Sequence, residues 1–160
     1  MTKIISALCA GAALLLVSCT ENIDASKAII GDWTIVEADG ITVEKGFETP
    51  SLSFGEDGMM NGNTSINRMF GGYTVSSDKE ARISFGNLGM TRMAGPTFET
   101  ENAITAGLGK AANVKFSDLE HMQFLDAEGN VVMVLEKGLP AAELTPAETA
   151  QPAGETTAEE

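Results

Sequence analysis

The chain has 160 residues, and its 23 Asp and Glu against 10 Lys and Arg give a formal net charge of −13. Phosphate binding needs clustered Lys and Arg, so we expect no nucleic-acid partner for so acidic a protein. The length favours a single domain that is large enough to bury a core of its own.

The first 18 residues have the composition of an export signal. Lys3 supplies a positive charge, and residues 4–16 are almost wholly apolar. A membrane-spanning helix needs about 20 apolar residues, so this run is too short to span and fits the apolar part of a signal peptide. We therefore assign residues 1–18 to a signal peptide.

The residues that follow carry a more specific signal. The run Leu16-Val17-Ser18-Cys19 resembles the lipobox of bacterial lipoproteins. The resemblance implies cleavage before Cys19, acylation of Cys19 with lipids such as palmitate, and sorting to the outer membrane because Thr20 rather than Asp follows. Two or more acyl chains anchor a protein stably. We expect a protein anchored in the cell envelope through Cys19, with residues 19–28 as a lipidated tether. The alternative is an ordinary secretory signal in which Cys19 is incidental.

Short apolar runs separated by Gly and Asp turns predict strands along residues 29–137. The predicted strands cover residues 29–37, 41–43, 51–54, 59–63, 72–75, 81–85, 114–116, 119–125 and 131–136. One helix is predicted to begin at Pro96 and to end near Gly107 and Gly109. This order favours a mainly β (α+β) fold, an antiparallel meander curled into a barrel-like sheet with one packed helix.

Residues 138–160 differ in composition from the rest of the chain. They are rich in Pro, Ala, Glu and Thr, and they contain no Lys or Arg. Such a segment has too little apolar surface to fold, so it predicts a disordered acidic tail. The tail is either a solvated spacer or a segment that binds a partner.

Several short motifs between residues 29 and 137 occur in a distinctive order. Trp33 is followed by PSLSF at 50–54, GNTSINRMFGGY at 62–73 and TRMAGP at 91–96, and then by an acidic helix and two closing strands. In this order the region resembles the META domain of HslJ-like heat-shock proteins and related bacterial envelope lipoproteins. The resemblance implies a small mixed β fold with a helix, and no firmly assigned activity.

Two positions depart from the family pattern. Family members often carry cysteines where this chain has Ile66 and Gly95. Because both cysteines are missing together, we expect Ile66 and Gly95 to be neighbours. The only cysteines are then Cys9, in the signal peptide, and Cys19, so residues 29–137 hold neither a disulfide nor a thiol nucleophile.

The sequence offers no complete set of catalytic residues, so we expect neither enzyme activity nor a cofactor. The single histidine, His121, falls on the outer face of a predicted strand, and no second ligand type accompanies it for a metal site. Seven methionines lie between residues 59 and 133, and we interpret them as core fillers. Binding of Cu(I) by Met90 and Met93 is the alternative.

The polar part of the central motif is a candidate recognition surface, formed by Asn67, Arg68, Phe70 and Tyr73. In a purely structural alternative, Asn67 holds a turn and Arg68 pairs with a carboxylate. We expect the domain to be a binding or interaction module, with a role in envelope stress and an envelope protein as partner. The alternative is a carrier of a small apolar ligand in a lipocalin-like barrel, which a cavity bounded by four aromatic residues would indicate. These residues are Trp33, Phe54, Phe85 and Phe124.

Overall fold

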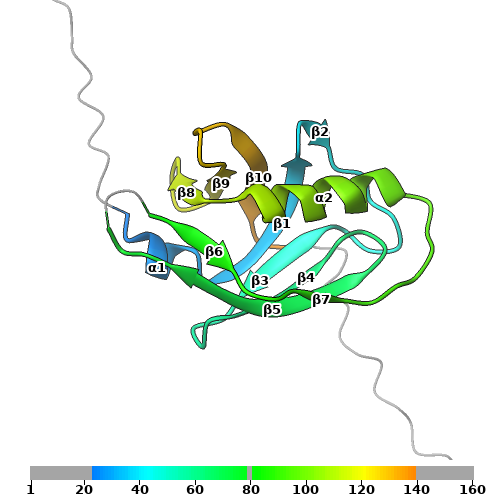
Figure 1. Ribbon diagram of the computed structural model, residues 1–160, viewed down its shortest axis with the longest axis horizontal. Coiled ribbons are helices and arrows are strands. Elements are labelled where there is room, and N and C mark those ends of the chain that lie inside the picture. Colours follow the sequence, from blue (N-terminus) through cyan, green and yellow to red (C-terminus); the bar gives the residue numbers. More distant parts are fainter. Residues whose placement is uncertain (1–22, 79–80, 140–160) are drawn as a thin grey trace, which may run out of the picture.

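The computed structural model describes residues 23–78 and 81–139. The predicted signal peptide, the acylated Cys19 and nearly all of the predicted tail lie outside the described residues. The described residues form one antiparallel sheet with two helices (Figure 1). The helices are α1 (Ala25–Ala28) and α2 (Phe98–Lys110). The strands are β1 (Gly31–Ala38), β2 (Ile41–Thr42), β3 (Ser51–Phe54), β4 (Met59–Asn63), β5 (Arg68–Val75), β6 (Ile83–Phe85), β7 (Gly89–Met90), β8 (Asn113–Phe116), β9 (His121–Leu125) and β10 (Val131–Lys137).

The sheet curls into a nearly closed barrel. Its strands follow the order β6-β5-β4-β3-β1-β10-β9-β8, with β2 added beside β1 and β7 beside β5. The two outer strands approach each other at the bridge between Arg82 and Asn113. The longer helix, α2, packs against β1 and β10 (Figure 1). The predicted fold class, an antiparallel barrel-like sheet with one packed helix, is confirmed.

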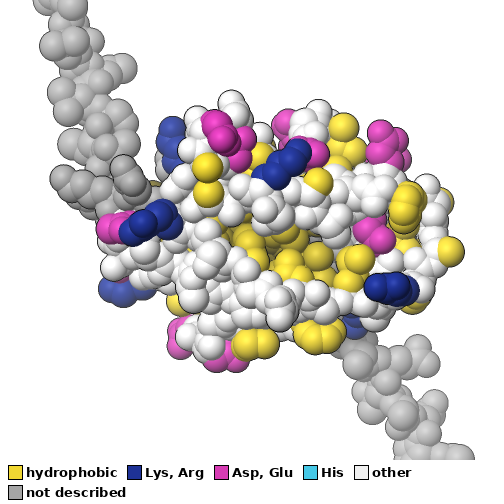
Figure 2. All heavy atoms as spheres, in the orientation of Figure 1, with side chains coloured by type: hydrophobic (Ala, Val, Ile, Leu, Met, Phe, Trp, Pro, Cys, Tyr) yellow, Lys and Arg dark blue, Asp and Glu magenta, His cyan; other side chains and the backbone are white. Residues whose placement is uncertain are grey.

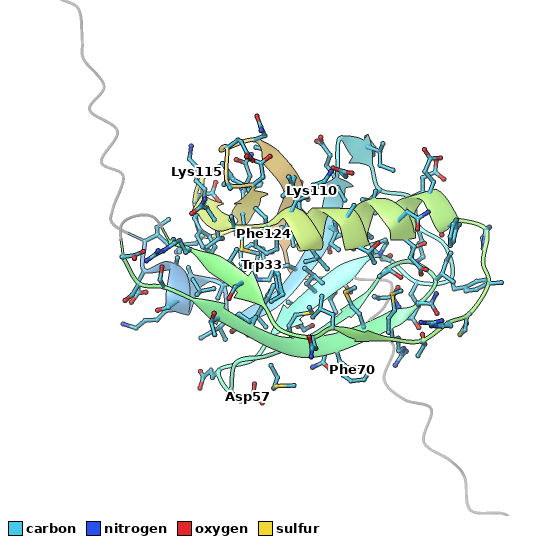
Figure 3. All side chains as sticks on the ribbon, in the orientation of Figure 1. Trp33, Asp57, Phe70, Lys110, Lys115 and Phe124 are labelled. Carbon is cyan, nitrogen blue, oxygen red and sulfur yellow. The ribbon has the colours of Figure 1, made fainter. Side chains whose placement is uncertain are left out.

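Aromatic side chains fill the interior of the barrel. Trp33 is fully buried, and its indole Nε1 donates to the carbonyl of Ile29 at 2.7 Å. The ring of Phe54 lies 6.3 Å from that of Phe124 and 6.5 Å from that of Phe85, measured between centroids. Trp33 and Phe124 both project beneath α2 (Figure 3). Burial of each such side chain contributes about 1.5–3 kcal/mol, so this cluster is a main source of stability.

The long helix begins later and ends farther along than its sequence predicted. Pro96 lies in the preceding loop, and Thr97 is the residue before the first helical one. The helix continues through Gly107 to Lys110. Gly107 serves packing, since a Cβ there would lie 2.8 Å from the carbonyl oxygen of Val132. The close contact between α2 and β10 compensates for the weak helix propensity of glycine.

Three further elements differ from the prediction. Residues 25–28, which were assigned to the tether, form α1, and both Ala25 and Ile29 are buried. Strand β5 starts at Arg68 rather than at residue 72, and the two-residue β7 was not predicted. The added part of β5 pairs with β4 and β7 pairs with β5, whereas α1 is held by the burial of Ala25 and Ile29. Local sequence patterns reveal neither kind of contact.

The interpretation of the methionines is right for four of the seven and wrong for three. Met60, Met69, Met122 and Met133 are buried in the core. Met59, Met90 and Met93 keep 44%, 37% and 56% of their surface exposed. Met59 lies on the outer face of β4. Met90 ends the two-residue strand β7 and Met93 lies in the loop after it, so neither belongs to a strand with one buried face. Neither of the described helices is long and apolar enough to cross a membrane.

Candidate functional site

Asn67 joins three segments of the chain at one end of the barrel. Its Oδ1 accepts from the backbone N–H of Met93 at 2.6 Å and from the hydroxyl of Thr91 at 2.8 Å. Its Nδ2 donates to the carbonyl of Met93 at 3.1 Å and to Oε2 of Glu101 at 2.7 Å. Every donor and acceptor of the side-chain amide is therefore used, and only 2% of the residue is exposed.

The residues that Asn67 joins form a cluster that we call the Asn67 clamp: Thr64, Asn67, Thr91, Met93 and Glu101. Glu101 is its acidic member. Glu101 lies in the first turn of α2, where the helix dipole favours a carboxylate. It is 7% exposed, and Thr64 Oγ1 lies 2.8 Å from its Oε2. Donors from Thr64 and Asn67 thus replace the lost hydration of the charge. The clamp fixes the start of α2 to the β4–β5 turn.

The two positions at which family members often carry cysteines lie beside the clamp. A Cβ at Gly95 would lie 2.7 Å from Cγ1 of Ile66, and Ile66 is 4% exposed. The predicted contact between Ile66 and Gly95 is confirmed. In this chain Ile66 and Gly95 occupy these two positions. Their apolar contact joins the β4–β5 turn to the loop before α2, the two segments that carry the cysteines in those family members.

A groove opens above the clamp, between the loop of residues 91–97 and the start of α2. Its volume is about 500 Å³, and its lining consists of Asn67, Met90, Thr91, Arg92, Met93, Ala94, Gly95, Phe98 and Glu101. Three lining side chains are large, apolar and exposed: Met90, Met93 and, at 63%, Phe98. In the space-filling view, hydrophobic side chains gather between α2 and the strands β5 and β7 (Figure 2). Apolar surface gathered in this way is typical of a contact site.

The four predicted recognition residues do not form one surface. Asn67 is on the floor of the groove. Tyr73 is half-buried, and its hydroxyl donates to the carbonyl of Gly55 at 2.8 Å. Arg68 and Phe70 are exposed on the outer face of β5, and Phe70 projects away from α2 (Figure 3).

Arg68 and Phe70 have local partners on that face. Arg68 Nη2 lies 2.9 Å from Glu48 Oε1, and this hydrogen bond and the charge of Glu48 raise the pKa of Arg68. The Phe70 ring covers Gly89, where a Cβ would lie 2.7 Å from Cζ. Arg92 and Phe98 were not predicted as part of a site, and Met90 and Met93 were considered only as an alternative Cu(I) site. Large apolar residues within a Gly- and Pro-containing loop are the signal that was available.

The META domain pattern matches residues 27–138. The chain belongs to the META domain family. No curated protein matches it.

Two solved structures are similar to this META domain in fold. The first is a protein whose structure was determined by NMR. It is 24% identical, its TM-score is 0.51, and the alignment covers 66% of this chain and 87% of that protein's chain. The second is a DUF4847 family protein from Bacteroides vulgatus ATCC 8482. It is 13% identical, its TM-score is 0.51, and the alignment covers 75% of this chain and 98% of that protein's chain. At these identities the similarity supports the fold alone.

Among the described residues of the META domain, one histidine forms a pair with a carboxylate on the surface. His121 is exposed, and its Nδ1 lies 2.8 Å from Oδ1 of Asp118. This hydrogen bond raises the pKa of His121 and lowers that of Asp118. Across residues 23–78 and 81–139, no three His, Cys, Asp or Glu side chains are grouped so that they can hold a metal ion.

Proposed function

We propose that this protein is a lipid-anchored component of the bacterial cell envelope whose META domain is a protein-interaction module. The groove is the observation that carries the proposal. Met90, Met93 and Phe98 expose apolar side chains around a floor held by Asn67. Methionine and aromatic side chains are enriched at the cores of protein–protein interfaces relative to the rest of the surface.

The anchor rests on the lipobox-like run that ends at Cys19, and Thr20 favours the outer membrane. The chain from Cys19 to Ile23 spans at most about 18 Å when extended, because each residue adds about 3.3–3.6 Å. A membrane reached through this segment lies near α1. The loop between β7 and α2 is at the opposite end of the long axis (Figure 1). The groove would therefore face away from the membrane, where an envelope protein can reach it.

The packing of the barrel gives less support to a carrier of a small apolar ligand. Trp33 and Phe124 are fully buried, and Phe85 lies 5.8 Å from Phe124 between ring centroids. These side chains occupy the space that a ligand inside the barrel would need. A binding role also agrees with the polar groups of the clamp, which are committed to one another rather than to a substrate.

Site-specific photo-crosslinking in intact cells tests the proposal. A photoreactive residue replaces Phe98 in the groove or, as control, exposed Lys115 on β8 at the other end of the domain (Figure 3). A discrete protein adduct at position 98 and not at 115 is expected. Equal adducts at both positions, or adducts at neither, would contradict an interaction module with this groove as its site. In parallel, Cys19→Ser is expected to abolish incorporation of labelled palmitate and to release the protein from membranes.

A further inference from the structure

Among residues 23–78 and 81–139, β7 pairs only with β5, so its other edge carries no strand there. In an antiparallel pair, residues that bond across the ladder alternate with residues whose N–H and C=O point outward. The N–H of Thr91 donates to the carbonyl of Arg68 at 3.0 Å, and Met90 is the non-bonded partner of Met69. The backbone N–H and C=O of Met90 therefore point away from β5. An exposed edge of this kind is a template for a further strand.

The same edge of the sheet is closed at the α1 end. There the N–H of Ile83 donates to the carbonyl of Ala112 at 2.9 Å, and the N–H of Val114 donates to the carbonyl of Ala81 at 2.8 Å. These bonds join β6 to β8 and complete the barrel. Farther along, α2 packs on β1 and β10 rather than on β7. The barrel thus stays open beside β7, where Figure 2 shows hydrophobic side chains between the strands and the helix.

We propose that the opening of the barrel between β7 and α2 binds an extended peptide segment of a partner protein. The peptide adds as a strand to the free edge of β7. The inference rests on the proposed interaction function and names the kind of partner and its mode of binding. Backbone hydrogen bonds to Met90 supply affinity, and alternate side chains of the peptide enter the groove beside Met93 and Phe98. Because side chains alternate along a strand, the peptide has apolar residues at every second position.

Charge adds a second requirement to the peptide. Arg92 lines the groove, is exposed, and forms no ion pair with any residue of the described ranges, whereas Arg68 is already paired with Glu48. A free guanidinium at the rim of an apolar groove favours a carboxylate in the ligand. The partner segment is therefore apolar at alternate positions and acidic between them.

Peptide selection with matched variants tests this mode of binding. The full mature chain, with Cys19→Ser for solubility, is used to select from a displayed library of random short peptides. Met90→Pro removes the outward N–H and leaves the bonds to β5 intact, since proline is tolerated on a free edge. Met90→Leu keeps that N–H. Arg92→Glu is compared with Lys115→Glu, which changes the net charge equally on distant β8.

The expected selection yields peptides that alternate apolar and acidic residues. Met90→Pro weakens their binding about tenfold and Met90→Leu by less than about threefold, because one backbone bond is lost only in the first. Arg92→Glu weakens binding and Lys115→Glu does not. In hydrogen exchange, the amide of Met90 gains protection when the peptide is bound.

Four results would overturn the inference. The first is a selection that returns no peptides, and the second is a selection whose peptides bind Met90→Pro as tightly as the unchanged chain. If peptides bind only after residues 140–160 are removed, the protein's own tail is the occupant. If the chain dimerises and Met90→Pro prevents this, a second copy is the occupant. A position-specific crosslink at Phe98 in cells, together with any of these results, would retain the interaction module and reject only strand addition.

Discussion

Replacement of Asn67 by alanine is predicted to be among the most destabilising single changes in the domain. Asn67→Ala removes four side-chain hydrogen bonds. The N–H of Met93 loses its acceptor, and the carboxylate of Glu101 loses one of its donors. A neutral hydrogen bond contributes about 1 kcal/mol and one to a charged group about 1.5–3 kcal/mol. Water that enters from the groove replaces part of this, so the expected loss is about 3–4 kcal/mol.

Urea unfolding, followed through fluorescence of the single tryptophan Trp33, measures this loss. With a slope of about 1.5 kcal/mol/M for a domain of this size, the midpoint falls by about 2 M. Asn61→Ala is the matched control, because Asn61 is exposed on β4, and it is expected to change stability by less than about 0.5 kcal/mol. A loss below about 1 kcal/mol for Asn67→Ala would refute the view that the clamp holds the loop and α2 together.

Three more outcomes are expected. Ile66→Cys with Gly95→Cys forms a disulfide under oxidising conditions, seen as the loss of the mass of two hydrogen atoms. The closed loop favours folding by about 3.5 kcal/mol, and a lower Tm when oxidised than when reduced would refute this. Phe124→Ala loses about 3–5 kcal/mol in urea unfolding, and a much smaller loss would indicate a hollow barrel. NMR titration gives His121 a pKa above 6.5 that Asp118→Asn lowers; an unchanged pKa would contradict the pair.

The sign of the pH effect follows from these two pKa shifts. The raised pKa of His121 stabilises the folded state below about pH 6.5, and this contribution is lost as pH rises through the folded pKa. The lowered pKa of Asp118 stabilises it above about pH 4, and this contribution is lost as pH falls through the folded pKa. The pair therefore stabilises the fold fully between about pH 4 and pH 6.5, and the contribution is absent in Asp118→Asn.

Most of the sheet could be predicted because its strands carry their own signals. Trp33 and Ile35 alternate with polar neighbours along β1, and Met122 and Phe124 alternate with His121 and Gln123 along β9, so the pattern alone indicates which side chains face the interior. The bounds of β3 and β4 match their predictions because turns with Gly and Asp delimit them. Periodicity of this kind depends only on neighbours along the chain, so one sequence is enough to read it.

The site could be predicted only in part, because it is made by contacts between distant segments. Asn67 was singled out, but nothing in its neighbourhood indicates that its amide binds Met93 and Glu101 from other parts of the chain. These contacts hold the backbone of Met93 in the loop that precedes α2, and the helix begins at Phe98. Met90 was interpreted as a core filler, and Phe98 lies within the predicted helix, so neither residue was recognised as lining a groove.

Native mass spectrometry of the mature chain, purified gently from its own envelope, tests most directly whether the META domain binds proteins rather than carrying a small molecule. A protein-interaction module predicts the mass of the chain with its acyl groups on Cys19, either alone or with a partner protein. A reproducible small-molecule mass, in addition to the acyl groups and retained by Cys19→Ser, would contradict it and identify the protein as a carrier.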